Sequence, residues 1–248
     1  MSATSDLLVA FELHSPDRIR AALQKGASPV ELITGKTPLL SLIEMYSRSP
    51  RFADCLRVML EAGATFDDPV LQSILLEDSS TLSKVISAAP ELINRRTYLS
   101  CTFTSMNGVT PLHVCAEYNS VACARVLLAA GASVNARAEV DADGIGGHTA
   151  LFHTVNSNAN FARPSMELLL DAGADLDILL KGVIWGGGFE WETTVFEVTP
   201  ISYAQCGLYS QFHRNESEIY SNIALLYQRK YGASPQIRNV PNQYLRKS

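Results

Sequence analysis

The sequence lacks the features by which several functional classes are recognised. Its 5 cysteines are odd in number, widely spaced and without a C-x-x-C pair, so we expect reduced, mostly buried thiols and no structural zinc site. No stretch approaches the ~18 apolar residues of a membrane span, and the N-terminus lacks the basic start and apolar run of a secretory signal. We therefore expect a cytoplasmic protein with no membrane partner.

Positive charge is also scarce. The chain has 20 Lys and Arg against 25 Asp and Glu, which gives a net charge of −5, and its body contains no long basic run. Nucleic-acid binders usually need a cationic field, so we expect no nucleic-acid partner. The exception is a basic C-terminal tail, assigned to residues 235–248 and interpreted as a solvated end.

Signals of catalysis or cofactor binding are weak. His113 and Cys115 lie two positions apart on one predicted helix and point to different sides, which excludes a nucleophile–base pair. The D-A-D-G run at 141–144 lacks the later acidic ligands of a calcium loop, and the G-I-G-G and G-G-G runs do not fit a phosphate loop. His148 and His153 make a poor zinc pair. The sequence thus predicts no metal, no cofactor and no enzyme.

What the sequence does contain is a repeated helix-pair pattern. Its clearest copy reads N-G-V-T-P-L-H-V-C-A at 107–116 and V-L-L-A-A-G-A-S-V-N at 126–135. This pattern closely resembles the ankyrin repeat. The resemblance implies that Thr110 caps the first helix, that His113 hydrogen-bonds beside that cap, and that Gly131 ends the second helix with positive φ.

The pattern recurs along nearly the whole chain. The predicted capping positions are Ser5, Thr37, Asp68, Thr110, Thr149 and Thr199. The predicted closing turns are Gly26, Gly63, Ala89, Gly131, Gly173 and Gly232. The distance from cap to turn is 21 residues in the first, third and fourth repeats and 26, 24 and 33 in the others, which implies longer helices or loops there. The predicted fold is all-α, an ankyrin-repeat solenoid of about six helix pairs with β-hairpin insertions, over residues 1–234.

The spacing of the repeats predicts three extended fingers, near 94–108, 136–147 and 176–198. In the last of these, Phe189 and Trp191 alternate with Glu190 and Glu192, which favours a strand, and the glycines at 186–188 can form the turn of a hairpin. The first finger alternates similarly, so a second ribbon is expected in a position to pair with the other.

The aromatic side chains of these fingers are candidate partner contacts. They include Tyr98 and Phe103 on the first finger and Trp185, Phe189 and Trp191 on the last, with Glu190 on its polar edge. They form either an exposed hot spot or a cluster folded back on the stack, because a lone hairpin is marginal in water. The sequence leaves both possibilities open.

The resemblance also implies a concave face lined by the first helices of the repeats. The positions that follow the T-P-L-H tetrad fall on one helical face and mix polar with aromatic groups. The candidate contacts there are Glu44, Gln72, Glu117, Tyr118, His153, Asn156 and Tyr203.

The function that follows is a protein–protein interaction module, an adaptor, inhibitor or scaffold that binds another protein through its groove and fingers. One alternative is a hydrolase or transferase with a site between finger and groove, using His153, Cys206 or Glu190. Another is a structural subunit that self-associates through the aromatic finger. The sequence is compatible with a monomer and leaves the oligomeric state open.

Overall fold

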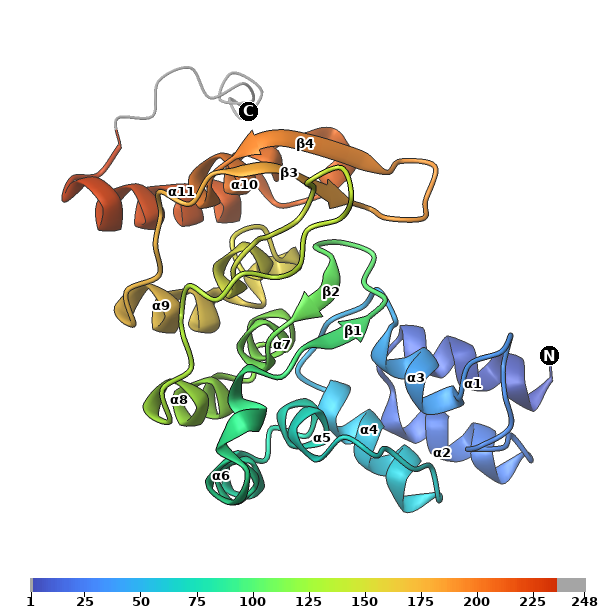
Figure 1. Cartoon of the computed structure of the whole chain (residues 1–248). Helices are drawn as coiled ribbons and strands as arrows, with labels where there is room; N and C mark the ends of the chain where they lie inside the picture. Colours follow the sequence, from blue (N-terminus) through green and yellow to red (C-terminus); the bar gives the residue numbers. More distant parts are fainter. Residues whose placement is uncertain (1, 236–248) are drawn as a thin grey trace.

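The chain forms a series of helix pairs, as a computed structural model of residues 2–235 shows (Figure 1). The pairs are α1 (Ala3–Glu12) with α2 (Pro16–Gln24), α3 (Pro38–Ile43) with α4 (Phe52–Glu61), α5 (Pro69–Leu75) with α6 (Ser79–Ala88), α7 (Pro111–Tyr118) with α8 (Val121–Ala129), the 3-10 turn η2 (Ala150–His153) with α9 (Arg163–Asp171), and α10 (Pro200–Cys206) with α11 (Glu216–Tyr231). Most of the predicted basic tail lies outside the described residues. Within residues 2–235, no helix combines the length and apolar character that crossing a membrane requires.

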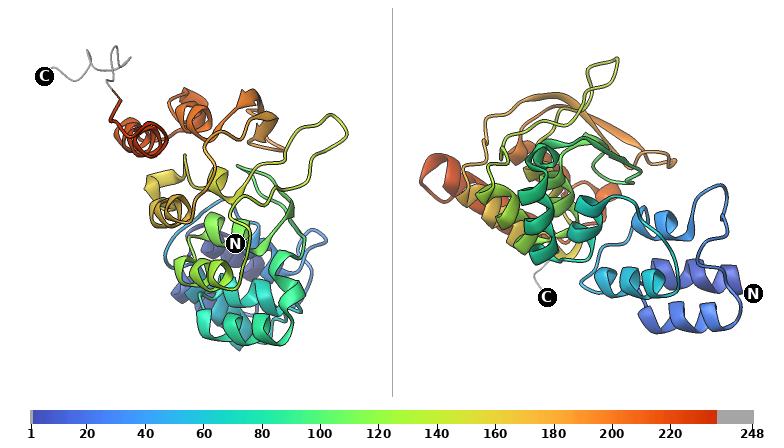
Figure 2. Two further views of the ribbon diagram at one scale, coloured as in Figure 1. Left: turned by 60° about the vertical axis from the view of Figure 1, so that its left-hand side comes forward. Right: turned by 60° about the horizontal axis from the view of Figure 1, so that its bottom comes forward.

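The pairs stack along an arc around one continuous apolar core. In Figure 1 the chain runs from α1–α4 at the right, through α5–α8 below, to α10 and α11 at the top, and the right-hand view of Figure 2 shows the N-terminal helices projecting to one side of the later repeats. The core extends from Leu7 in the first pair to Leu226 in the last. Each pair covers the apolar flank of the next, which is why no pair is expected to be stable alone.

The helices begin largely where the capping pattern predicts. The side chains of Thr37, Asp68 and Thr199 accept hydrogen bonds from the backbone N–H three residues later, at 3.2, 2.9 and 3.3 Å. A proline follows each of these caps, where its missing N–H costs nothing. The prediction for the first repeat is wrong by one turn, because α1 begins directly after Ser2, whose Oγ accepts the Ser5 N–H at 3.1 Å.

The closing turns follow the predicted glycines, with one exception. Positive φ angles occur at Gly26, Gly63, Gly131, Gly173 and Gly232. Ala89 does not form such a turn, because its φ is −142° and the chain passes directly into the 3-10 helix η1 (Pro90–Asn94). The proline that follows Ala89 disfavours a helical conformation there. Asn119 adopts the left-handed conformation, with φ of 55°, that its place between two helices implies.

The extra length within three repeats is mostly loop. In the second repeat residues 44–51 separate α3 from α4, and in the fifth residues 154–162 separate η2 from α9. The fifth repeat's first element is therefore a single 3-10 turn that starts after Thr149, whose side chain makes no capping hydrogen bond among residues 2–235, and the loop after it has Ala159 and Asn160 at positive φ. The sixth repeat has both a loop and a longer second helix, the 16-residue α11.

Two of the three predicted fingers are antiparallel hairpins. The first pairs β1 (Thr97–Leu99) with β2 (Met106–Val109), and the last pairs β3 (Leu180–Trp185) with β4 (Thr193–Val198). The expectation that Phe189 and Trp191 lie on a strand is wrong: residues 186–192 form the loop between β3 and β4. The chain turns at Gly186, with φ of 78°, so the alternating side chains after it lie in a loop and not on a strand.

The two hairpins remain separate two-stranded sheets, because the middle finger lies between them. The Gly146 N–H donates to the Gly182 carbonyl on β3 at 2.9 Å. On the other side, Tyr98 on β1 donates its hydroxyl to Glu139 at 2.6 Å. The middle finger therefore links the two hairpins to each other along the inner side of the stack.

Candidate partner-binding pocket

A pocket of about 550 Å³ opens where the two ends of the repeat stack approach one another. Its walls come from the segments after α1 and α3, from the first and last fingers, and from the loops of the fifth and sixth repeats. The lining segments are 12–14, 46–49, 103–104, 156–158 and 211–214, with Glu117, His153, Phe161, Trp185 and Trp191. Residues far apart in the sequence thus meet at one place, which only the curvature of the stack allows.

One wall of the pocket is formed by packed rings, which we call the aromatic cluster (Phe103, Trp185, Trp191 and Phe212). Trp185 lies at its centre, with its ring centroid 3.9 Å from Phe212, 5.5 Å from Phe103 and 4.9 Å from Trp191. Phe189 stacks on Trp191 at 4.8 Å. Trp185 is 1% exposed, whereas Trp191 and Phe189 are 38% and 46% exposed. The cluster therefore anchors the last finger to the stack at one end and offers aromatic surface at the other.

The floor of the pocket carries a buried ion pair. Arg48 Nε donates to Glu117 Oε1 at 2.9 Å, and Glu117 Oε2 lies 2.9 Å from His153 Nδ1. The Arg48 guanidinium also binds the carbonyls of Met45 and Ser47, so it is held on several sides. This network joins the loop of the second repeat to the first helical elements of the fourth and fifth.

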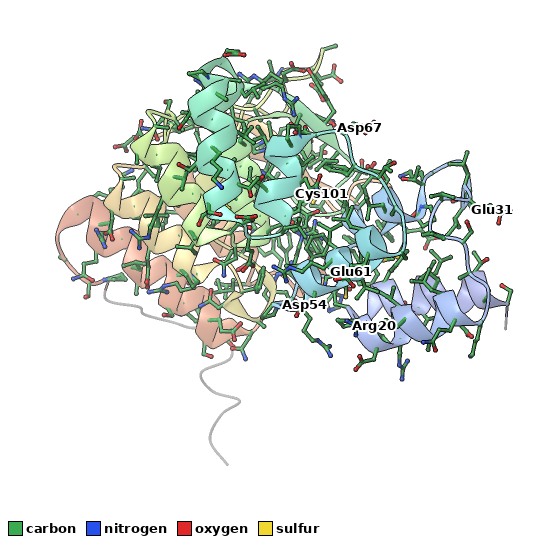
Figure 3. The ribbon with its side chains drawn as sticks, turned by 90° about the horizontal axis from the view of Figure 1, so that it is seen from below. Arg20, Glu31, Asp54, Glu61, Asp67 and Cys101 are labelled. Carbon is green, nitrogen blue, oxygen red and sulfur yellow. The ribbon has the colours of Figure 1, made fainter. Side chains whose placement is uncertain are left out.

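The electrostatics of this network favour the ionised forms of both Arg48 and Glu117. Burial raises the pKa of Glu117, but Arg48 and His153 outweigh it and lower that pKa to about 2. Burial raises the pKa of the neighbouring Cys101 thiol to about 12, and the Glu117 carboxylate adds to the effect. Figure 3 shows Cys101 enclosed among side chains, in contrast to the peripheral Glu31. A thiol held protonated in this way is a poor nucleophile.

Arg214 is the second cation of the pocket, and its environment differs from that of Arg48. Its Nε donates to the Asn156 carbonyl at 2.6 Å and its Nη1 to the Phe212 carbonyl at 2.8 Å. The guanidinium carbon lies 4.9 Å from the Phe103 ring centroid and 5.7 Å from that of Trp185. Among residues 2–235, no acidic side chain forms an ion pair with Arg214. Burial lowers its pKa, a cost that Tyr203 and Glu117 partly offset.

The structure brings about half of the predicted contact residues to this pocket. Those that line it are Phe103, Glu117, His153, Asn156, Trp185 and Trp191. Glu117, His153 and Asn156, expected on an exposed concave face, are buried, at 7%, 4% and 4% exposed, and Trp185, for which both exposure and packing were open, is 1% exposed. They are buried because the loops of the second and sixth repeats, whose paths the repeat pattern does not specify, cover the concave side.

The other predicted contacts lie elsewhere. Tyr118 is buried behind the floor, where its hydroxyl donates to the Ile43 carbonyl at 2.5 Å, and Tyr203 is fully buried against Thr104. Glu44 and Gln72 are half-buried away from the pocket. The exposed ones are Tyr98, Phe189 and Glu190 on the fingers. In this conformation a partner can therefore contact the exposed finger residues, Trp191 among them, but it cannot contact Tyr118 or Tyr203.

Sequence reasoning missed three residues that shape the pocket: Arg48, Phe212 and Arg214. All three lie in loops that lengthen the second and sixth repeats beyond the family period. The long cap-to-turn distances show that such loops exist, but no local pattern indicates that they turn toward the concave side.

Three histidines, His113, His148 and His153, converge beside the floor. Their ring centroids are 5.1 to 5.9 Å apart, edge to face. Burial lowers the pKa of His113 to about 3 and that of His148 well below its usual value, so both rings are neutral at pH 7. Across residues 2–235, no group of three histidine, cysteine or acidic side chains has an arrangement that could hold a metal ion.

His113 instead reproduces the capping arrangement of the repeat pattern. Its Nδ1 lies 2.8 Å from Thr110 Oγ1 and accepts the Thr110 N–H at 3.2 Å, while its Nε2 lies 3.2 Å from the carbonyl of His148 in the next repeat. One side chain thus fixes the start of α7 and ties it to its neighbour. A family model of the ankyrin repeat matches residues 107–139, which contain this cap. This part of the chain is an ankyrin repeat.

Two solved structures of ankyrin-repeat domains are similar to the chain. The human ASB11 ankyrin repeat domain is 20% identical, with a TM-score of 0.40, and the match covers 93% of this chain and 84% of that one. The ankyrin repeat domain of Bcl-3, described as a member of the IkappaB protein family, is 20% identical with a TM-score of 0.38, over 88% of this chain and 80% of that one. No curated protein matches the sequence.

Ankyrin repeats generally mediate protein–protein interactions and are typically non-enzymatic. The residues considered for catalysis do not come together within residues 2–235. His153 is bonded to Glu117, Glu190 lies in the exposed hairpin loop, and Cys206 donates to the Ser202 carbonyl at 3.3 Å. Burial raises the pKa of the Cys206 thiol to about 11. No nucleophile–base contact joins these three.

Proposed function

We propose that this ankyrin-repeat protein is a binding module, acting as an adaptor, inhibitor or scaffold, that holds a partner protein in the pocket on its concave side. The observation that carries the proposal is the pocket of about 550 Å³, built from both ends of the repeat stack and lined by the aromatic cluster and two arginines. Aromatic and arginine side chains are the residue types in which interfaces concentrate binding energy.

The rigidity of the pocket supports the same function. Trp185 and Phe212 stack with 11° between their planes, and Arg48 is fixed by bonds to two carbonyls and a carboxylate. Because these groups are already ordered, association with a partner costs little conformational entropy on this side. The five free cysteines of the described chain fit the cytoplasmic location that we also propose.

The test is selection of binders from a library of random twelve-residue peptides displayed against the full-length protein. Trp191→Ala removes an exposed ring from the pocket and should abolish binding of most selected peptides. Tyr231→Ala is the matched control, because Tyr231 is 57% exposed on α11 and does not line the pocket. Failure to select any peptide, or equal binding by both variants, would argue against the pocket as the binding site.

A second candidate function is self-association through the last finger. The observation that favours it is that two aromatic rings of this finger are exposed. Phe196 on β4 is 64% exposed and Phe189 in the adjoining loop 46%. Light scattering should then detect oligomers in the wild type and monomers in the Phe189→Ala, Phe196→Ala double variant. A monomeric wild type at high concentration would eliminate this candidate.

A further inference from the structure

The formal charges of the pocket sum to zero, with Arg48 and Arg214 against Glu12 and Glu117, but one of the two cations has no ion-pair partner among residues 2–235. Arg48 and Glu117 neutralise each other across 2.9 Å. Glu12, at the outer edge, accepts a hydrogen bond from the hydroxyl of Tyr46. Arg214 forms no such pair among residues 2–235, and its Nη2 makes no hydrogen bond there. A cation with a free face is therefore built into the pocket wall.

The position of this cation is fixed before any ligand arrives. The Nε and Nη1 groups of Arg214 are held by two backbone carbonyls, at 2.6 and 2.8 Å, and its plane lies against Phe103 and Trp185. The N–H groups left for a ligand are the two of Nη2 and the second one of Nη1. A guanidinium that is ordered in this way loses little freedom when it binds an anion.

A purely apolar occupant does not fit this arrangement. A partner segment that covered Arg214 with aliphatic side chains would remove water from the guanidinium and leave its Nη2 without a partner, which is costly for a charged group. A carboxylate replaces that water with a charge-assisted hydrogen bond, which is stronger than a neutral one. The rings of Phe103 and Trp191 beside it offer apolar contact to the neighbouring side chains of the same segment.

A doubly charged phosphate fits less well than a carboxylate. Arg214 is the only cation of the pocket without an acidic partner in the described chain, and Glu12 and Glu117 place two carboxylates in the same walls. A phosphate would need several free donors, as in sites that cluster arginines. One free guanidinium face matches a single negative charge.

We propose that the pocket binds an internal segment of a partner protein that carries an aspartate or glutamate beside an apolar side chain, with the carboxylate on Arg214 Nη2. This inference rests on the proposed function and specifies the chemistry of its partner. It predicts that peptides selected on the full-length protein are enriched in sequences with an acidic residue next to an aromatic or aliphatic one.

The experiment uses those selected peptides, resynthesised with acetylated N-termini and amidated C-termini so that no terminal carboxylate remains. Each is made with its acidic residue and with glutamine or asparagine in its place. Because both tryptophans of the chain, Trp185 and Trp191, line the pocket, intrinsic fluorescence reports binding there. The acidic form should bind at least about tenfold more tightly than the amide form, as expected for a hydrogen bond between charged groups.

Substitution of the arginine should remove that difference. In Arg214→Gln the acidic and amide peptides should bind alike, and Arg214→Lys should retain a reduced preference because the ammonium lacks the planar fork. Arg125→Gln is the matched control, since Arg125 is exposed on α8 outside the pocket. Thermal unfolding of each variant establishes whether it is folded. If Arg214→Gln does not fold, the comparison of acidic and amide peptides on the wild-type protein still tests the proposal.

The outcomes separate this inference from the proposed function. Peptides that depend on Trp191 but bind equally in acidic and amide forms would overturn the acidic partner and leave the binding module in place. A preference for phosphoserine in the acidic position, or for an uncapped C-terminal carboxylate, would also overturn the proposal. If no peptide is selected, or if the selected peptides ignore Trp191, both fail.

Discussion

The indole of Trp185 stacks on the ring of Phe212, with 3.9 Å between centroids and 11° between planes. This contact joins the third strand to the loop before the last helix. Two segments that insert into different repeats are thereby fixed to each other, and the loop that carries Arg214 is held against the pocket.

Replacement of Trp185 by alanine should destabilise the fold by about 3–5 kcal/mol, because a large buried ring is lost and its neighbours cannot fill the space. Trp185→Phe should cost much less. The Phe ring retains most of the stacking, and the buried Nε1 that it removes has no hydrogen-bond partner among residues 2–235. Urea unfolding followed by circular dichroism measures both. Equal losses for Ala and Phe would contradict the importance of stacking.

Replacement of Glu117 by glutamine should be strongly destabilising, by about 3–5 kcal/mol, because it leaves the buried Arg48 without its counter-charge. The Arg48 and Glu117 side chains are only 9% and 6% exposed, so water cannot compensate. Glu190→Gln, on the exposed hairpin loop, serves as the control and should change stability by no more than about 0.5 kcal/mol. If Glu117→Gln were as stable as the control, the ion pair would have no structural role.

The stability of the protein should fall as pH decreases from 7 toward 4. Burial lowers the pKa of His113 to about 3, with a further contribution from His153, and that of His14 to about 4, with contributions from Arg48 and Arg51. Below the usual histidine pKa of about 6.5 the unfolded chain binds protons that the folded chain does not. The free energy of unfolding therefore falls as the pH falls, until the pH reaches the histidine pKa values of the folded protein.

Urea midpoints at pH 7.5, 6 and 5 check this dependence. His14→Gln removes one of the two histidines and should make the decline with pH shallower. Glu117 adds a second decline as pH falls from its ordinary pKa of 4.5 to about 2, because Arg48 and His153 lower its pKa in the folded protein against the effect of burial. A midpoint that is constant between pH 7.5 and 5 would contradict the buried neutral state of His14 and His113.

Gly186 and Gly188 offer a matched pair in the hairpin loop. Both have positive φ, of 78° and 85°, so alanine should cost about 1–2 kcal/mol of backbone strain at either position. A Cβ at Gly186 would also approach within 2.2 Å of the Trp191 ring, whereas one at Gly188 would meet nothing within 4 Å. We therefore expect Gly186→Ala, and not Gly188→Ala, to shift the fluorescence of Trp191. Identical spectra for the two variants would show that Trp191 does not pack against Gly186.

Much of the repeat architecture could be predicted because its signals are local. Thr37, Asp68 and Thr199 cap helices through atoms three residues away, and Gly63 ends a helix through its own φ angle. Where local signals conflict, the prediction was wrong. The alternation around Phe189 is a strand pattern, yet the adjacent glycines turn the chain first, and the cap-like Ser5 stands one turn inside a helix that Ser2 begins.

The candidate pocket could be predicted only in part, because its parts are distant in sequence. Glu117, His153, Trp185 and Trp191 were found from repeat position and residue type. Arg48 and Arg214 lie in loops without a pattern, and nothing in the sequence indicates that Arg48 and Glu117, separated by 69 positions, meet. Whether the aromatic finger is packed or exposed was also undecidable, and the structure has both: Trp185 is buried and Trp191 is not.

The sequence by itself determined the all-α repeat, the start of the first helical element in most repeats and the presence of inserted hairpins. All of these depend on hydrogen bonds and φ angles within a few residues. Only the tertiary structure decided that the stack bends far enough to bring the loops at residues 46–49 and 211–214 to one pocket, that Glu117 is buried in an ion pair, and that Arg214 is left without one. Such pairings depend on the packing of whole repeats, where small differences in each interface add up along the arc.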